Sequence, residues 1–95
     1  MYINSIAHYS PSRVVPNSYF ASITDRTEEW LLTRTGIEER RRTEEGEDLH
    51  SMLLQAVDNL IPKLPYDKSE IDLIVCGTYT PIDTVATAAH HVQHH

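Results

Sequence analysis

The 95-residue chain contains one cysteine, three glycines and no long apolar run. Its single cysteine, Cys76, cannot form a disulfide within the chain, which excludes a disulfide-stapled fold and suits a reducing compartment such as the cytoplasm. No stretch approaches the roughly 20 apolar residues of a membrane-spanning helix. The first residues also lack the basic flank and apolar core of a signal peptide. We therefore expect a soluble, cytoplasmic protein with no membrane partner.

An excess of basic residues is also missing. The chain has 14 Asp and Glu residues against 8 Lys and Arg residues, a formal net charge of −6. Because a nucleic-acid interface needs a basic face to neutralise phosphates, this balance argues against a nucleic-acid partner for the whole chain. A composition of 40% hydrophobic and 23% charged residues is typical of a globular domain. Any anion site must therefore be local.

No Walker A loop, GxGxxG, HExxH, GxSxG or CxxC motif occurs in the sequence. Cys76 lies inside an apolar run, where a cysteine acts as a small hydrophobic residue and lacks the electropositive, partly exposed setting of a nucleophile. The sequence therefore predicts no catalytic residue within the chain.

Hydrophobic periodicity and capping residues predict an alternation of strands and helices. Thr27 is a candidate N-cap and Gly36 a candidate C-cap of one helix, and either Asn17 or Ser18 is a candidate N-cap of the helix before it. Strands are expected at residues 2–9 and 71–76, helices at 19–23, 28–35, 49–61 and 86–95, and a polar excursion with little core at 37–46. This order predicts an α/β fold in which helices cover a mostly parallel sheet. No closing strand follows the last helix, which indicates an incomplete domain.

Trp30 and Arg34 lie four residues apart, which places an indole and a guanidinium on one helix face. Such a pair can stack on a planar base and hold a phosphate. A half-buried tryptophan beside a surface arginine at a helix end has the same spacing and is the commoner arrangement. The spacing alone therefore favours this second arrangement and marks the pair only as a candidate anion site.

Arg40, Arg41 and Arg42 form a basic cluster in an acidic chain. Glutamates at positions 38, 39, 44 and 45 flank the cluster, which favours a solvated edge with balanced charge over an anion-docking patch.

Histidines at positions 90, 91, 94 and 95 form two i, i+4 pairs if this segment is helical, a spacing that can chelate Zn or Ni. No acidic or cysteine partner lies near them in the sequence, so we predict adventitious metal binding and no dedicated metal site. A histidine-rich metal-binding end remains the alternative.

The order of four segments resembles the N-terminal part of β-ketoacyl-acyl-carrier-protein synthase III. The segments are EEWLLTRTGIEERR, the amphipathic helix, IDLIVCGTYTP and AAHHVQ, and the pattern W-x3-R-T-G-I-x2-R within the first is fairly specific to that family. The resemblance implies residues 1–95 to be an incomplete N-terminal half of a thiolase-like fold, with a mostly parallel or mixed sheet and covering helices.

The resemblance also implies a function for the parent protein, namely decarboxylative condensation of an acyl-CoA with malonyl-acyl-carrier-protein in fatty acid biosynthesis. The family works as a homodimer and takes a coenzyme A thioester as substrate, with no further cofactor. By this resemblance Trp30 stacks on the CoA adenine, Arg34 lies at the CoA entrance, and Val85 limits the acyl pocket of the partner subunit. The segment at residues 79–89 then lies at the dimer interface.

Several positions depart from the family pattern. Arg26 stands where a threonine near the adenine is often found, Ala86 replaces a common proline, and Ser5 and Ala7 replace glycines. These changes leave open a condensing-enzyme paralogue of secondary metabolism. The family's cysteine nucleophile and its His and Asn partners lie beyond the last residue, so we expect the 95-residue chain to be inactive alone. A non-catalytic binding or dimerisation module is the alternative.

Overall fold

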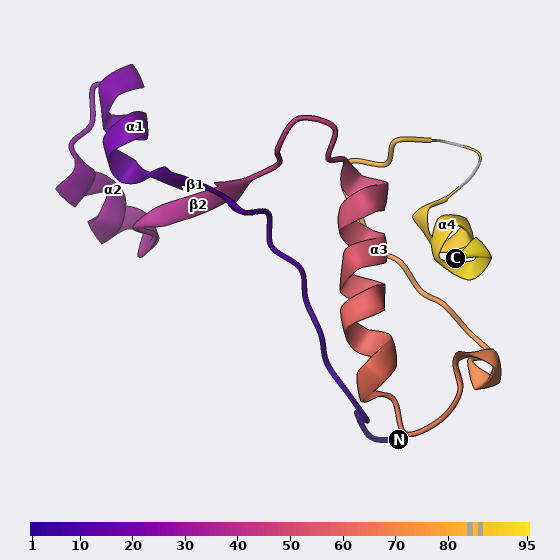
Figure 1. Ribbon diagram of the computed structural model, residues 1–95. Coiled ribbons are helices and arrows are strands. Elements are labelled where there is room, and N and C mark those ends of the chain that lie inside the picture. Colours follow the sequence, from indigo (N-terminus) through magenta and orange to yellow (C-terminus); the bar gives the residue numbers. More distant parts are fainter. Residues whose placement is uncertain (84, 86) are drawn as a thin grey trace. The chain divides into compact units, whose positions relative to one another are not determined.

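The computed structural model describes residues 1–83, 85 and 87–95, and the chain divides into two compact units (Figure 1). We call Ser10–Gly46 the hairpin unit, and we call Met1–Tyr9 together with Glu47–His95 the long-helix unit.

The hairpin unit is built on two short antiparallel strands, β1 (Arg13–Pro16) and β2 (Glu39–Arg42). Val15 pairs with Arg40 in this register and is one of the buried residues of the structure. The expected parallel sheet is therefore wrong for the described residues, in which the one sheet is two-stranded and antiparallel. Sequence reasoning missed both strands because each is only four residues long and β2 is a charged ERRR segment without apolar alternation.

Two helices complete this unit, α1 (Asn17–Ile23) and α2 (Glu28–Thr35). The expected N-cap of α1 is wrong, because Pro16 is the N-cap and makes no side-chain cap hydrogen bond. The Asn17 side chain instead donates to the Ile37 carbonyl at 2.6 Å.

The long-helix unit is organised by α3 (Leu49–Leu60), whose apolar spacing predicted it. A capping box begins this helix: Asp48 accepts from the backbone N–H of Ser51, and the Ser51 hydroxyl oxygen accepts from that of Asp48. Three shorter helices follow, namely the 3-10 turns η1 (Ile61–Lys63) and η2 (Lys68–Glu70) and the helix α4 (Ala88–His94).

The end of α3 and the last helix agree with the prediction, and α4 packs against α3. The α-helix ends before Pro62, which lies in the 3-10 turn η1. The predicted first residue of the last helix, Ala86, lies outside the described residues. Nowhere in residues 1–83, 85 and 87–95 is a helix long and apolar enough to cross a membrane.

The strands expected at residues 2–9 and 71–76 are wrong, since neither segment is a strand in the structure. The first segment is not part of a sheet and is contacted by side chains: Asn59 of α3 donates to the His8 carbonyl at 3.0 Å, and the Lys63 ammonium donates to the Ile6 carbonyl at 3.3 Å. In the second, Leu73 and Val75 are 78% and 85% exposed. A strand needs a neighbour to pair with its backbone groups, and neither segment has one here.

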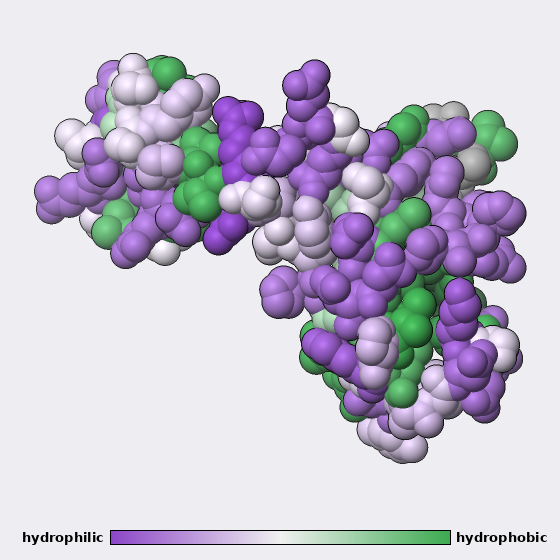
Figure 2. Space-filling view, in the orientation of Figure 1, coloured by the Kyte–Doolittle hydropathy of each residue, from purple (hydrophilic) through white to green (hydrophobic). Residues whose placement is uncertain are grey.

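The apolar side chains of residues 71–76 lead us to expect self-association of the chain. Apolar residues form a strip over the long-helix unit in Figure 2, and both Leu73 and Val75 are exposed. Burying such surface against a second copy lowers the free energy, so light scattering at about 50 μM should give a dimer or a larger species. A double change of Leu73 and Val75 to lysine should shift the chain towards monomer.

The matched control for this experiment adds the same two charges elsewhere. Gln55 and Gln93 are already exposed and polar, so changing both to lysine should leave the self-association as it is. A wild-type chain that is cleanly monomeric at this concentration contradicts the prediction.

The N-cap of α3 predicts a dependence of stability on pH. The hydrogen bond from the backbone N–H of Ser51 is the main cause that holds the pKa of Asp48 below its ordinary value. A lowered pKa in the folded state stabilises the fold above the unfolded pKa, and this contribution is lost as the pH falls through the folded pKa. Urea unfolding should therefore show wild type losing stability relative to Asp48→Asn between about pH 4 and pH 2. A stability difference that stays constant from pH 7 to pH 2 would refute this.

Candidate functional site

Local capping positions the candidate site on α2. The Thr27 hydroxyl oxygen accepts a hydrogen bond from the backbone N–H of Trp30 at 3.1 Å, which confirms Thr27 as the N-cap. At the other end Gly36 has φ +68°, and its N–H donates to the Leu32 carbonyl at 2.7 Å. This left-handed C-cap conformation favours glycine, as the sequence predicted. The two caps place Trp30 in the first turn of α2 and Arg34 in its last turn.

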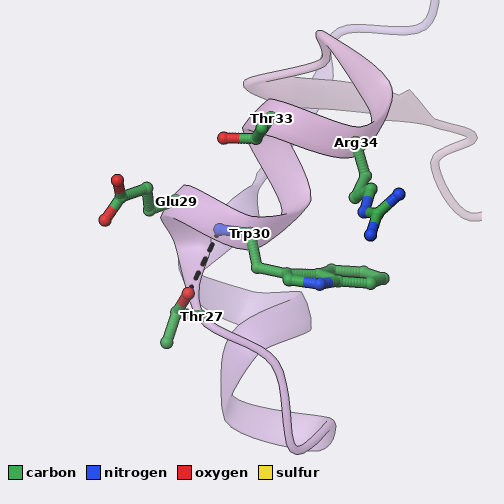
Figure 3. A pocket seen from close by; sticks show the side chains of 5 residues that line it. All are labelled: Thr27, Glu29, Trp30, Thr33 and Arg34. Atoms are coloured by element: carbon green, nitrogen blue, oxygen red, sulfur yellow. Dashed lines mark hydrogen bonds between the residues drawn. The ribbon is translucent and has the colours of Figure 1, made fainter.

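The structure brings the side chains of Trp30 and Arg34 together. The Arg34 guanidinium carbon is 5.8 Å from the centroid of the Trp30 ring, and both side chains project from the same side of α2 (Figure 3). Trp30 is 39% exposed, so the residue is accessible to another molecule. A flat aromatic surface beside a cation is suited to a ligand that combines a planar ring with a negative charge.

A hollow of about 430 Å³ lies at this part of α2. Its lining residues are all exposed in the structure and are Thr27, Glu29, Trp30, Thr33 and Arg34. Figure 3 shows that Glu29 and Thr33 project to the opposite side of the helix from Trp30 and Arg34. The indole and the guanidinium therefore share one side, while the carboxylate of Glu29 points away from them.

Arg26 is a further cation beside the indole. Its guanidinium carbon is 4.7 Å from the Trp30 ring centroid, closer than that of Arg34. Sequence reasoning noted Arg26 as a departure from a family pattern but assigned it no role. The helix periodicity that links Trp30 to Arg34 does not extend to Arg26, because α2 begins only at Glu28. The contact depends on the path of the chain between α1 and α2.

The basic cluster of β2 is used for contacts within the hairpin unit. Arg40 is half-buried, donates to the Asn17 side-chain oxygen at 3.0 Å and places its guanidinium carbon 4.5 Å from the Phe20 ring centroid. Arg41 donates to the carbonyls of Pro11 and Ser12, each at 3.3 Å. These contacts favour a structural role for Arg40 and Arg41 over an anion-docking patch.

Val85 and Cys76 lie in the long-helix unit, whereas Trp30 and Arg34 lie in the hairpin unit. The Val85 side chain is exposed, and its backbone N–H donates to the Asp83 carboxylate at 2.8 Å. Cys76 is half-buried in the extended segment that follows η2.

Three of the last histidines have partners within the long-helix unit. The His91 ring stacks on His50 of α3 with centroids 3.7 Å apart, and His95 Nε2 lies 2.7 Å from Asp58 Oδ1. The His90 ring accepts from the Thr87 backbone N–H at 3.2 Å. In the part of the chain that the structure describes, no three His, Cys, Asp or Glu side chains are grouped so that they could hold a metal ion.

The sequence of the chain is similar to those of one class of protein, the β-ketoacyl synthases. No protein-family model matches the chain. The chain is 34% identical over 91 residues to the beta-ketoacyl-acyl-carrier-protein synthase III of Dinoroseobacter shibae. It is 40% identical over 77 residues to that of Aliarcobacter butzleri, and 33% identical over 93 residues to that of a Streptococcus agalactiae strain.

These matches cover most of this chain but only part of each relative. They span 96%, 81% and 98% of the chain, and 28%, 23% and 28% of the relatives' lengths in the same order. The expected resemblance is therefore confirmed, and the chain corresponds in sequence to a portion of a beta-ketoacyl-acyl-carrier-protein synthase III.

Proposed function

We propose that the side of α2 bearing Trp30 and Arg34 binds the adenine nucleotide part of a coenzyme A thioester. The observation that carries this proposal is the exposed indole with the Arg34 guanidinium carbon 5.8 Å from its ring centroid. Adenine stacks on the indole, and the guanidinium donates paired hydrogen bonds to a phosphate. The hollow beside α2 gives the ribose room.

The function proposed for the longer protein is acyl transfer by decarboxylative condensation of an acyl-CoA with malonyl-acyl-carrier-protein. The names of the relatives support this activity, and with it a place in fatty acid biosynthesis. This protein is a cytoplasmic homodimer in which Val85 limits the partner subunit's acyl pocket, and the exposure of Val85 is compatible with such a contact. It needs no cofactor beyond the thioester substrate.

Residues 1–95 form, on this proposal, an incomplete N-terminal thiolase-like domain without the catalytic cysteine. Condensation needs a thiolate nucleophile and groups that stabilise the developing oxyanion. Cys76 is half-buried in the extended segment at residues 71–76, and no residue of the hollow beside α2 is a thiol or a histidine. The chain binds coenzyme A without turning it over.

The test separates binding from turnover. Trp30 is the only tryptophan of the chain, so quenching of its fluorescence by coenzyme A reports directly on the site. We expect saturable quenching by the 95-residue chain, and no condensed product when it is incubated with acyl-CoA and malonyl-acyl-carrier-protein. The longer protein should form the product. Turnover by the 95-residue chain would refute its proposed inactivity, and an absence of quenching would refute the proposed site.

A non-catalytic binding or dimerisation module is the second candidate. The confinement of the hollow's lining to Thr27–Arg34 favours it, because a nucleotide site on one helix needs no catalytic half. The reading frame after His95 decides between the candidates: a cysteine followed by His and Asn partners supports the enzyme, and a stop codon supports the module. A condensing enzyme of secondary metabolism differs from both in the acyl-CoA that it accepts, which an assay of the longer protein with a series of acyl-CoAs would show.

A further inference from the structure

Arg26 is placed to take part in ligand binding although the proposed site does not include it. Its guanidinium carbon lies 4.7 Å from the Trp30 ring centroid. Its Nε is 3.4 Å from Asp25 Oδ1, and the two side chains are 52% and 87% exposed. An ion pair so exposed to water contributes little free energy, so the guanidinium is free to exchange Asp25 for a stronger partner.

Two guanidinium groups therefore lie within 6 Å of one indole centroid, those of Arg26 and Arg34. A site that only stacks a neutral base gains little from a second cation in water. Binding of a phosphate group gains more from the second cation than binding of a neutral base does. Each guanidinium presents a planar fork of donors that matches the phosphate oxygens. Among the nearby acidic residues, Asp25 pairs only weakly with Arg26, and Glu29 projects from the other side of α2 (Figure 3).

We propose that Arg26 is a ligand-binding, specificity-determining residue of this site. Its guanidinium contacts a phosphate of the bound nucleotide while the base stacks on Trp30, so Arg26 selects phosphorylated adenosine over adenosine itself. This inference rests on the proposed nucleotide site. It assigns to Arg26 a role that the Trp30 and Arg34 pair alone does not supply.

The experiment uses the 95-residue chain and the fluorescence of its one tryptophan. The probes are adenosine, adenosine 5′-monophosphate, adenosine 3′-monophosphate and adenosine 3′,5′-bisphosphate, each titrated into wild type, Arg26→Ala and Arg26→Lys. The control is Arg13→Ala, which removes one positive charge from an exposed position on β1 in the same unit. The two monophosphates distinguish which phosphate Arg26 contacts.

We expect Arg26→Ala to weaken binding of the bisphosphate about fivefold and to change adenosine binding less than about twofold. Arg26→Lys should recover part of the loss, because it keeps the charge without the planar fork. Arg13→Ala should match wild type. The discrimination should shrink as salt is raised from about 0.05 M to 0.5 M, because both the site and the ligand are exposed to screening.

Two results would overturn the inference while leaving the proposed site intact. Equal weakening of adenosine and bisphosphate by Arg26→Ala would mean that Arg26 supports the stacking and not the phosphate. Tighter binding of both ligands would mean that Arg26 merely covers the ring and competes with the base. If no probe quenches wild type, the proposed site fails, and the inference fails with it.

Discussion

Replacing Trp30 with alanine should weaken coenzyme A binding by about 5- to 150-fold, the range measured when an aromatic platform is removed from beneath a nucleic-acid base. Trp30 is 39% exposed and offers a flat aromatic ring. The backbone N–H of Trp30 donates to the Thr27 hydroxyl oxygen, which holds the residue at the start of α2. Alanine removes the ring but keeps this backbone bond. Because the variant lacks tryptophan, calorimetric titration takes the place of fluorescence.

Two matched variants make this test specific. Trp30→Phe keeps a smaller ring and should lose only part of the affinity. Tyr19→Ala removes an exposed aromatic of α1 that does not line the hollow, so its affinity should equal that of wild type. In the longer protein the same Trp30→Ala change should raise KM for the acyl-CoA and leave kcat nearly unchanged, because the adenine lies far from the reacting thioester. Wild-type affinity in Trp30→Ala would reject the stacking role.

Replacing Asn17 with alanine should lower the free energy of unfolding by about 1–3 kcal/mol, the usual cost of leaving buried polar groups without partners. Asn17 is only 5% exposed. Its side chain donates to the Ile37 carbonyl at 2.6 Å and accepts from Arg40 at 3.0 Å, while its backbone N–H donates to the Glu38 carbonyl at 3.0 Å. Alanine removes the two side-chain bonds, so the Ile37 carbonyl and the Arg40 guanidinium each lose a hydrogen-bond partner.

The neighbouring residue supplies the control. Ser18 is exposed, so Ser18→Ala should change the free energy of unfolding by less than about 0.5 kcal/mol. Urea titration measures this value for Asn17→Ala and for Ser18→Ala. Asn17→Asp keeps the oxygen that accepts from Arg40 but loses the donor to Ile37, and should fall between wild type and Asn17→Ala. Equal stabilities of Asn17→Ala and Ser18→Ala would show that these bonds do not hold the hairpin unit together.

The Asn17 bonds also bear on the candidate site. They connect Asn17, the first residue of α1, to the carbonyls of Ile37 and Glu38, which follow α2. They therefore hold the pair of helices α1 and α2 next to the strands β1 and β2. Trp30, Arg34 and Arg26 belong to this part of the chain. Weaker nucleotide binding by Asn17→Ala is therefore an expected secondary effect of its lower stability.

The helices that sequence reasoning predicted well are those whose causes are local. Thr27 caps the start of α2 and Gly36 caps its end. The apolar spacing of α3 continues from its Asp48 cap to the turn that contains Pro62. A cap or an i, i+4 repeat acts within about one turn of helix, so the residues concerned are neighbours in the sequence. The pairing of Trp30 with Arg34 was predictable for the same reason.

The errors concern backbone pairing between distant segments. The hairpin of β1 and β2 joins residues more than 20 positions apart, and no apolar alternation marks either strand. The apolar segments at residues 2–9 and 71–76 were predicted as strands from composition. In the structure they lack the neighbours that a sheet requires.

By itself the sequence determined the helices α2, α3 and α4, the two caps of α2, the Trp30 and Arg34 pair, and the resemblance to β-ketoacyl-acyl-carrier-protein synthase III. Only the tertiary structure decided that Arg40 packs on Phe20 and Asn17, and that Arg26 lies beside the indole. The physical reason is the range of the interactions. Capping and helix periodicity act between near neighbours, whereas strand pairing and a cation placed over a ring depend on the path that the chain takes between its elements.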